Sequence, residues 1–140
     1  MRNITPLAGA KNSAGLAQTD LVNCKVRCFK QGFNPAENTT AADLIAQECD
    51  FDDYVAKVIA AWGNPVLAPV SGYQIVAPTQ SWIVVTNATP NVVGGYWIET
   101  AAGVLVSIVQ FDDPGVAMNN VDDALYVTPV VFVPTQNLSA

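Results

Sequence analysis

The sequence predicts an all-β fold: a jelly-roll-like β-sandwich with one short helix and an extended N-terminal arm. Two observations lead to this prediction. Short runs rich in Val, Ile, Thr, Tyr and Trp follow one another from residue 73 onward, and turn-forming clusters of Gly, Pro, Asn and Asp separate them. The length of 140 residues suits one domain with one hydrophobic core. We therefore expect an arm over residues 1–20 and a single β-sandwich domain over residues 21–140.

Residues 1–20 have the composition of an arm. Thr5-Pro6, Gly9 and Gly15 interrupt any helical or strand period, and apolar residues are sparse. Residues 1–30 hold five of the six cations and one acidic residue, whereas the rest of the chain holds one lysine and eleven acidic residues. We expect this basic arm to lie extended on a neighbouring chain or on a larger shell, not on its own body. A solvated, mobile terminus is the alternative.

Alternation predicts the first strand at Leu21–Phe29. Val22, Cys24, Val26 and Cys28 form its apolar face, and mostly polar residues form the other. Cys24 and Cys28 then lie about 13 Å apart along the strand, which is too far for a disulfide. Cys49 could meet either of them, and the sequence leaves that choice open. We expect reduced, buried thiols.

A short helix and a strand follow. Thr39-Thr40 precede Ala41–Gln47, where threonine is a fair N-cap and Asp43 is favourable in the first turn, so one or two helical turns are predicted. Alternation then predicts a strand at Tyr54–Trp62, although its alanines also suit a helix. Gly63-Asn64-Pro65 ends this element.

The later strands are predicted at Tyr73–Val76, Gln80–Thr86, Val93–Thr100, Val104–Phe111 and Leu125–Val133. A three-residue link ending in Gly103 predicts a hairpin between the third and fourth of these. Gly94-Gly95 indicates a bulge or a close approach of backbones, and Pro129 belongs at an edge or a bulge. Tyr96 and Trp97 must point to opposite faces, so we expect one in the core and the other exposed or at an interface.

Charge is scarce in this chain. Hydrophobic residues make up 51% and charged residues 13%, about half the usual charged share. Apolar surface must therefore be covered by a core, by sister subunits or by a larger partner. The net charge of −6 disfavours nucleic acid as the main partner. No membrane span and no signal peptide are apparent, so we expect a protein made in a cytoplasm.

Little in the sequence indicates catalysis. The chain has no histidine, which removes Ser–His and Cys–His nucleophiles, the usual general base and the commonest metal ligand. Asp52-Asp53, Asp112-Asp113 and Asp122-Asp123 are acidic pairs in predicted loops. Carboxylate catalysis and cation binding are the alternatives for them, but such pairs are typical of turns and caps. We predict no enzyme, no catalytic, cofactor-binding or metal residues, and no cofactor.

A carbohydrate-binding platform is a further alternative. The aromatic residues that suggest it are Trp62, Tyr73, Trp82, Tyr96 and Trp97. Core positions explain the same residues better, because neighbouring residues of a strand cannot share one face.

Short pieces within residues 22–134 carry a resemblance. They are Phe29–Pro35, Ala42–Leu44, Asp50–Tyr54, Trp62–Pro65, Gly95–Thr100, Gln110–Pro114 and Leu125–Pro129. In these pieces the chain resembles small structural β-domain proteins encoded by bacteriophages and prophages. The resemblance implies a capsid decoration or tail-associated domain, and it implies no catalytic residues.

The leading functional hypothesis is a capsid decoration (cement) protein that stabilises the head shell of a bacteriophage virion. Low charge, excess apolar residues and a basic arm ahead of a β body motivate it. The expected partners are the major capsid protein or other virion proteins, and two further copies in a homotrimer. The alternative is a tail-fibre, head-fibre or spike domain that binds the host surface. A hydrolase acting through paired carboxylates is the third hypothesis.

Overall fold

The computed structural model describes residues 1–4, 21–63, 66–67, 73–86 and 89–133. Most described elements are strands, and a short helix accompanies them, so the all-β prediction is confirmed. The elements are β1 (Arg2–Ile4), β2 (Cys24–Lys30), α2 (Ala41–Ala46), β3 (Lys57–Ile59), β4 (Val66–Leu67), β5 (Tyr73–Val76), β6 (Gln80–Ile83), β7 (Asn91–Glu99), β8 (Leu105–Gln110), β9 (Val116–Met118), β10 (Ala124–Val127) and β11 (Val130–Val133).

The main sheet is antiparallel, with strand order β1-β8-β7-β2-β3 and with β9 paired to the start of β7. The predicted hairpin joins β7 to β8, and its Gly103 has a positive φ of 88° and donates its N–H to the Thr100 carbonyl. Gly95 of β7 lies against the Phe29 ring and the Val109 carbonyl, where a Cβ would overlap both. Glycine therefore permits the close approach that the sequence indicates.

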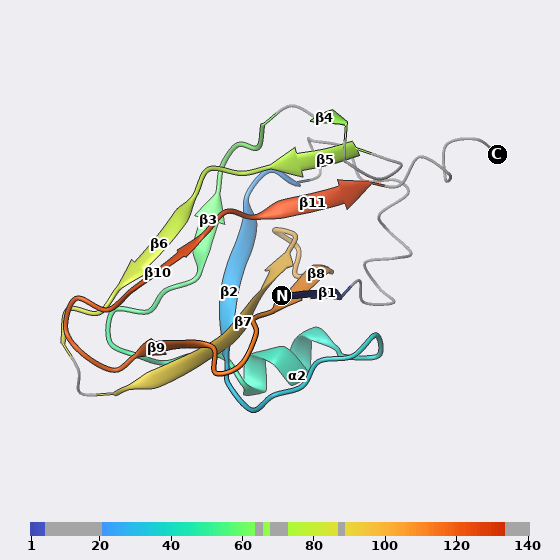
Figure 1. The fold of residues 1–140 in the computed structure, drawn as a ribbon. Coiled ribbons are helices and arrows are strands. Elements are labelled where there is room, and N and C mark those ends of the chain that lie inside the picture. Colours follow the sequence, from blue (N-terminus) through green and yellow to red (C-terminus); the bar gives the residue numbers. More distant parts are fainter. Residues whose placement is uncertain (5–20, 64–65, 68–72, 87–88, 134–140) are drawn as a thin grey trace.

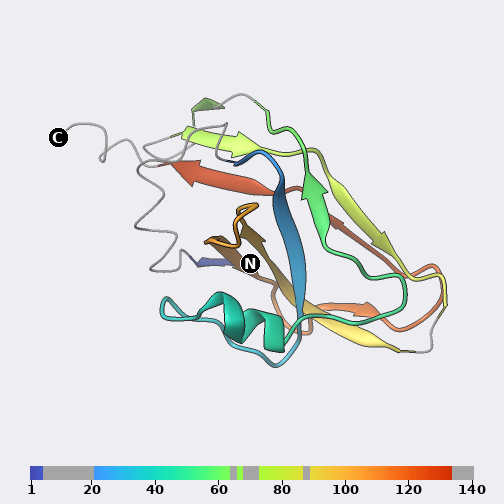
Figure 2. The same ribbon diagram turned by 180° about the vertical axis from the view of Figure 1, so that it is seen from behind.

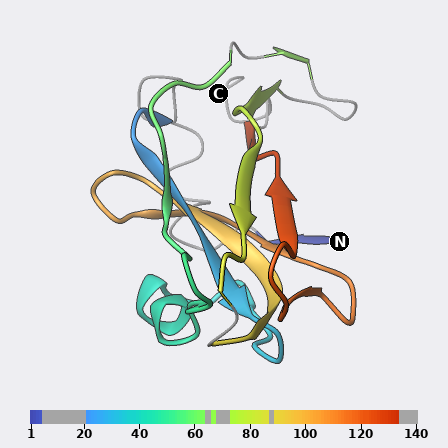
Figure 3. The same cartoon turned by 90° about the vertical axis from the view of Figure 1, so that its left-hand side faces the viewer.

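A long, bent, two-stranded ribbon forms a second layer. β5 leads into β6 and β10 leads into β11, while β6 pairs with β10 and β5 pairs with β11 (Figure 1). β4 adds a short strand to β5. In Figure 3, which looks onto β6 and β10, the strands β2 and β7 of the main sheet cross behind the ribbon.

Pro129 divides the last predicted strand. Leu125–Val133 was expected to be one strand, but it forms β10 and β11 with Thr128 and Pro129 between them. Residues 77–79 lie opposite these two residues, so the ribbon has a bulge of three residues against two. The Pro129 carbonyl still accepts the Ala77 N–H at 2.9 Å. The single-strand prediction is wrong because proline cannot donate the N–H that a continuous ladder needs.

The main core lies between the main sheet and the ribbon. The sheet contributes Cys24, Val26, Cys28, Tyr96, Ile98, Val106 and Val109. The ribbon contributes Ile75, Ala77, Trp82, Val84, Leu125, Val127 and Val131. Alternate residues of β6 and β10 thus point inward, as the period of two in a strand requires.

The opposite face of the main sheet carries a smaller core under α2. Its members are Ile4, Phe29, Leu44, Trp97, Leu105 and Ile108. Thr40 accepts the Asp43 N–H on its Oγ1 at 3.2 Å, and the Asp43 carboxylate accepts the Thr40 N–H at 3.0 Å. This capping box fixes the start of α2. In Figure 2 the helix lies on the side of the sheet away from β6 and β10.

Both faces of β7 are therefore covered. Tyr96 in the main core is 6% exposed, and Trp97 in the smaller core is 0% exposed. The expectation that one of these two rings is exposed or at an interface is wrong. Leu44 of α2 and Ile4 of β1 cover the face of β7 that carries Trp97. These residues are distant from β7 in the chain, so the local sequence pattern does not predict their contact with it.

Two segments differ from their prediction: the residues just before β2, and the predicted strand Tyr54–Trp62, which contains β3. Val22, expected on the apolar face, is 44% exposed, because Asn23 has a positive φ of 62° that breaks the alternation before β2 begins. The predicted strand Tyr54–Trp62 is strand only at Lys57–Ile59. Before β3 begins, the Tyr54 Oη accepts the N–H of Cys28 at 2.9 Å in place of a strand partner.

β1 lies within the segment expected to be an arm. Arg2–Ile4 pairs with β8, and Ile4 is 7% exposed in the smaller core. Residues 2–4 thus lie on their own sheet, contrary to the expectation for the arm, and a three-residue strand is too short for its pattern to be recognised. Residues 5–20 lie outside the described residues. β4 and β9, of two and three residues, are likewise strands that the sequence pattern did not indicate.

Candidate functional site

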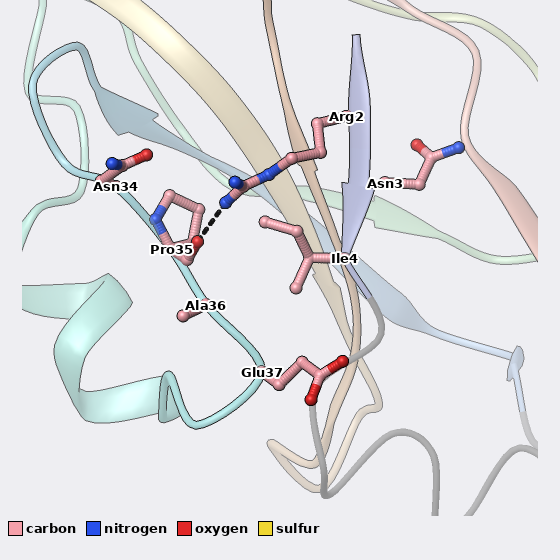
Figure 4. A pocket seen from close by; sticks show the side chains of 7 residues that line it. All are labelled: Arg2, Asn3, Ile4, Asn34, Pro35, Ala36 and Glu37. Atoms are coloured by element: carbon pink, nitrogen blue, oxygen red, sulfur yellow. Dashed lines mark hydrogen bonds between the residues drawn. The ribbon is translucent and has the colours of Figure 1, made fainter.

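A pocket of about 620 Å³ lies at the edge of the main sheet. It is lined by Arg2, Asn3, Ile4, Asn34, Pro35, Ala36 and Glu37. Figure 4 shows Arg2 reaching across it, where the guanidinium donates a hydrogen bond to the Pro35 carbonyl. Glu37 is the one carboxylate in this lining, whereas glycoside hydrolysis needs two. The Arg2 contact thus ties β1 to the loop before α2.

A polar cluster surrounds Arg27 of β2. Arg27 donates to Glu99 of β7 through Nε and to Glu48 through Nη1, the latter at 3.1 Å. Tyr54 Oη donates to the Glu48 carboxylate at 2.6 Å. Glu99 is only 4% exposed, so its charge depends on Arg27 for compensation.

The electrostatics of this cluster favour a structural role. Burial alone lowers the pKa of Arg27, but its hydrogen bonds to Glu48 and Glu99 raise the pKa above the ordinary value. Burial and the bond to Glu48 raise the pKa of Tyr54. Arg27 stays charged and Tyr54 stays protonated at neutral pH, so neither is a proton donor or acceptor tuned to that pH. The cluster joins β2, β7 and the segment after α2.

In each of the three acidic pairs, at least one carboxylate accepts hydrogen bonds that fix a loop or the N-terminus. Asp52 accepts a hydrogen bond from the Thr86 hydroxyl, and Asp112 accepts one from the Met1 ammonium at 2.5 Å. Asp113 accepts the Gln31 amide at 2.6 Å. Asp123 accepts the N–H groups of residues 119 and 120 at 3.0 and 2.9 Å, which is the turn role that such residues commonly have. In the described part of the chain, no three Cys, Asp or Glu side chains are grouped to hold a metal ion.

The three cysteines are free and buried, as the sequence predicts. Cys49 lies beside Cys28, with its N–H donated to the Cys28 carbonyl at 2.9 Å. Burial raises the pKa of the Cys24 thiol to about 11 and that of the Cys49 thiol to about 12. Burial, followed by the neighbouring Cys49, raises the pKa of Cys28 as well. Protonated, enclosed thiols are poor nucleophiles and poor metal ligands.

The suggested aromatic platform is core structure. Trp62, Trp82, Tyr96 and Trp97 are each at most 6% exposed. The indole N–H of Trp82 donates to the Val55 carbonyl at 2.7 Å, and that of Trp62 donates to the Leu21 carbonyl at 2.8 Å. These four rings therefore cannot stack on a sugar. The side chain of Tyr73 lies outside the described ones.

The outer face of the ribbon is the strongest candidate for a binding surface, because it has no charged residues. Residues 58–98 contain no Asp, Glu, Lys or Arg, and neither do residues 124–140. β4, β5, β6, β10 and β11 all belong to these two stretches, so the whole second layer is built from uncharged residues. Protein surfaces are usually rich in charge, and the centres of interfaces are depleted of it. This distribution was visible in the sequence but not recognised there as a signal.

Apolar side chains are exposed on this face. Tyr126 of β10 is 67% exposed, Ile83 of β6 is 47% exposed, and Val85 just beyond β6 is 61% exposed. The register places Ile83 opposite Ala124 and Ser81 opposite Tyr126. Hydroxyl groups extend the face, where Thr79 and Thr128 share a hydrogen bond of 2.7 Å. The arrangement suits the binding of another uncharged surface, not the chemistry of a small substrate.

No helix among the described residues is both long and apolar enough to cross a membrane. Comparisons with family models, with curated proteins and with solved structures give no significant match to this chain.

Proposed function

We propose that the chain is a bacteriophage virion protein, a capsid decoration (cement) protein that stabilises the head shell. It acts by binding and performs no catalysis. Its partners are the major capsid protein or other virion proteins together with further copies of itself, in a homotrimer. A jelly-roll-like sandwich and an arm that reaches a neighbouring subunit belong to the same proposal.

The uncharged outer face of the ribbon is the observation that carries this proposal. A surface with Ile83, Val85 and Tyr126 exposed, in a layer without charged residues, is costly to leave in water. An assembly covers such a surface permanently. At least one residue of each acidic pair and the members of the Arg27 cluster have hydrogen-bond partners within the chain, and the thiols are buried, which agrees with a binding role.

Tyr126 favours a second candidate function. Its ring is 67% exposed beside the Thr128 hydroxyl, and an exposed aromatic ring with a nearby hydroxyl can stack on a sugar of the host surface. A tail-fibre, head-fibre or spike domain would use the face in this way.

Immunogold labelling of negatively stained phage particles tests both functions. Antibodies against the purified chain should label the heads, at many sites per particle. Labelling confined to tails or to isolated fibres would support the second function. Particles that carry no label, although a major capsid antibody labels them, would contradict both.

A further inference from the structure

We propose that the outer face of β6 and β10 binds a second copy of this chain. This ribbon face consists of Thr79, Ser81, Ile83, Val85, Ala124, Tyr126 and Thr128. This contact rests on the proposed function, because the virion is where the copies would assemble. It names a second copy as the partner of this surface.

The strand geometry makes this surface continuous. Ser81, Ile83 and Val85 alternate with the buried Trp82 and Val84, so all three project outward. On the other strand, Tyr126 projects outward between the buried Leu125 and Val127. Cross-strand pairing then joins the two rows, because Ile83 faces Ala124 and Ser81 faces Tyr126.

The main core covers the inner face of the ribbon, which leaves the outer face as its free surface. Trp82 and Val84 from one side of the ribbon and Leu125 and Val127 from the other point into that core. β9, which pairs with β7 of the main sheet, comes close to β10. A second copy would therefore pack on this outer face, which in the proposed homotrimer is repeated around the three-fold axis.

The distribution of charge makes this face the one through which two copies can meet. The chain has a net charge of −6, and described acidic residues outside the ribbon include Glu37, Asp43, Asp50, Asp112 and Asp113. Two copies that met through those regions would bring like charges together. The ribbon face avoids this repulsion, although Asp122 and Asp123 border one end of it.

The chemistry of the face is also complementary to itself. Apolar groups of Ile83 and Val85 can pack on their equivalents, and the hydroxyls of Thr128 and Tyr126 both donate and accept hydrogen bonds. A face of this kind leaves no buried charge in need of an opposite charge on a different protein. An identical face therefore satisfies it.

Sedimentation velocity of the purified full chain tests the inference. The wild-type chain should sediment as an oligomer at tens of micromolar. The double variant Ile83→Lys/Tyr126→Lys should be monomeric, with self-association weakened by at least about a hundredfold, because it places unpaired charges in the contact. Both positions are exposed in the single chain, so the variant should still fold, and circular dichroism checks that.

Val58→Lys is the matched control. Val58 is 55% exposed on β3 of the main sheet, away from the ribbon face, so the same substitution there should leave the oligomer intact. A wild-type chain that is monomeric at tens of micromolar would overturn the inference. An oligomer that resists the double variant as well as it resists Val58→Lys would also overturn it.

Binding to phage shells lacking this protein separates this inference from the proposed function. If the monomeric double variant still binds shells, the face contacts another copy and the function stands. If a monomeric wild type binds shells and the double variant does not, the shell protein occupies the face and the second-copy inference fails alone. If an oligomeric wild type binds no shells, the proposed function fails alone.

Discussion

Cys24, Cys28 and Cys49 serve as small apolar side chains of the main core. Each is at most 3% exposed, and each packs among aliphatic and aromatic neighbours. A thiol fills such a space without the hydrogen-bonding demand of a hydroxyl, so Cys24→Ser would bury a polar group where the thiol needed no partner. The cysteines therefore affect stability through packing and through the cost of ionising a buried group.

This cost predicts a loss of stability in alkali. The pKa of Cys24 rises from 9.0 to about 11 on folding, and that of Cys49 rises from 9.0 to about 12. Above pH 9 the unfolded chain loses these protons first, so the folded chain binds more protons and the free energy of unfolding falls as pH rises. Each thiol contributes up to about 1.4 kcal/mol per pH unit in that window.

Urea denaturation between about pH 8 and pH 10.5 measures the effect. The free energy of unfolding should be constant near pH 8 and should fall steadily above pH 9. Cys24→Ala should show a shallower fall, since it removes one of the titrating thiols. Equal slopes in the wild type and in Cys24→Ala would show that Cys24 titrates normally in the folded chain.

Helix α2 illustrates how a short element depends on its cap and on one anchor. Six residues are too few for an independent helix, so α2 relies on the Thr40–Asp43 capping box and on the burial of Leu44. The helix in turn covers Trp97 and Phe29 on the second face of the main sheet. Loss of the cap should therefore be felt in the stability of the domain.

Thr40→Ala should lower the free energy of unfolding by about 1 kcal/mol, because the Asp43 N–H loses its acceptor. Thr40→Ser is the matched control, since its hydroxyl keeps that acceptor and should retain most of the stability. Thermal unfolding followed by circular dichroism compares the three proteins. If the serine variant is destabilised as much as the alanine variant, the methyl group and not the cap is what matters at position 40.

Elements with a local cause could be predicted from the sequence. The β5 strand has the predicted bounds, α2 follows its cap residue, and Gly95 permits the close approach that its neighbourhood indicated. Elements with a long-range cause could not. β1 is a strand only because β8 is beside it, and Tyr54 leaves the strand pattern because its hydroxyl caps the N–H of Cys28.

The candidate face was predictable only in part. The low overall charge indicated a surface that another molecule covers, but not where that surface lies. Its location follows from the pairing of β6 with β10, which joins two uncharged stretches that are distant in the chain. Only the fold brings Ile83 and Tyr126 onto one face.

At the scale of the whole molecule, charge and apolar surface are segregated. The uncharged ribbon forms one layer, and the main sheet with α2 and its loops carries most of the described charged residues. Such a molecule has one face suited to association and another that keeps it in solution. In the proposed assembly, the ribbon face joins copies while the remaining surface is left for the shell.

The attachment of the N-terminus to the body is the other whole-molecule property, and it yields the last prediction. Ile4 lies in the smaller core beside Trp97 and Ile108, while Arg2 and Met1 bind the Pro35 carbonyl and Asp112. Ile4→Ala should lower the free energy of unfolding by about 2–4 kcal/mol, because it removes buried methyl groups and leaves a cavity. Urea denaturation of the isolated protein gives this value.

Asn3→Ala is the control, because Asn3 is an exposed residue of the same strand and its truncation should change stability little. A purely extended arm predicts a different result, namely that neither substitution affects the isolated domain and that both act only on particle binding. An Ile4→Ala variant as stable as the wild type would favour that arm. The expected large difference between the two variants would instead place the start of the body at β1, with any anchoring function left to the residues that follow it.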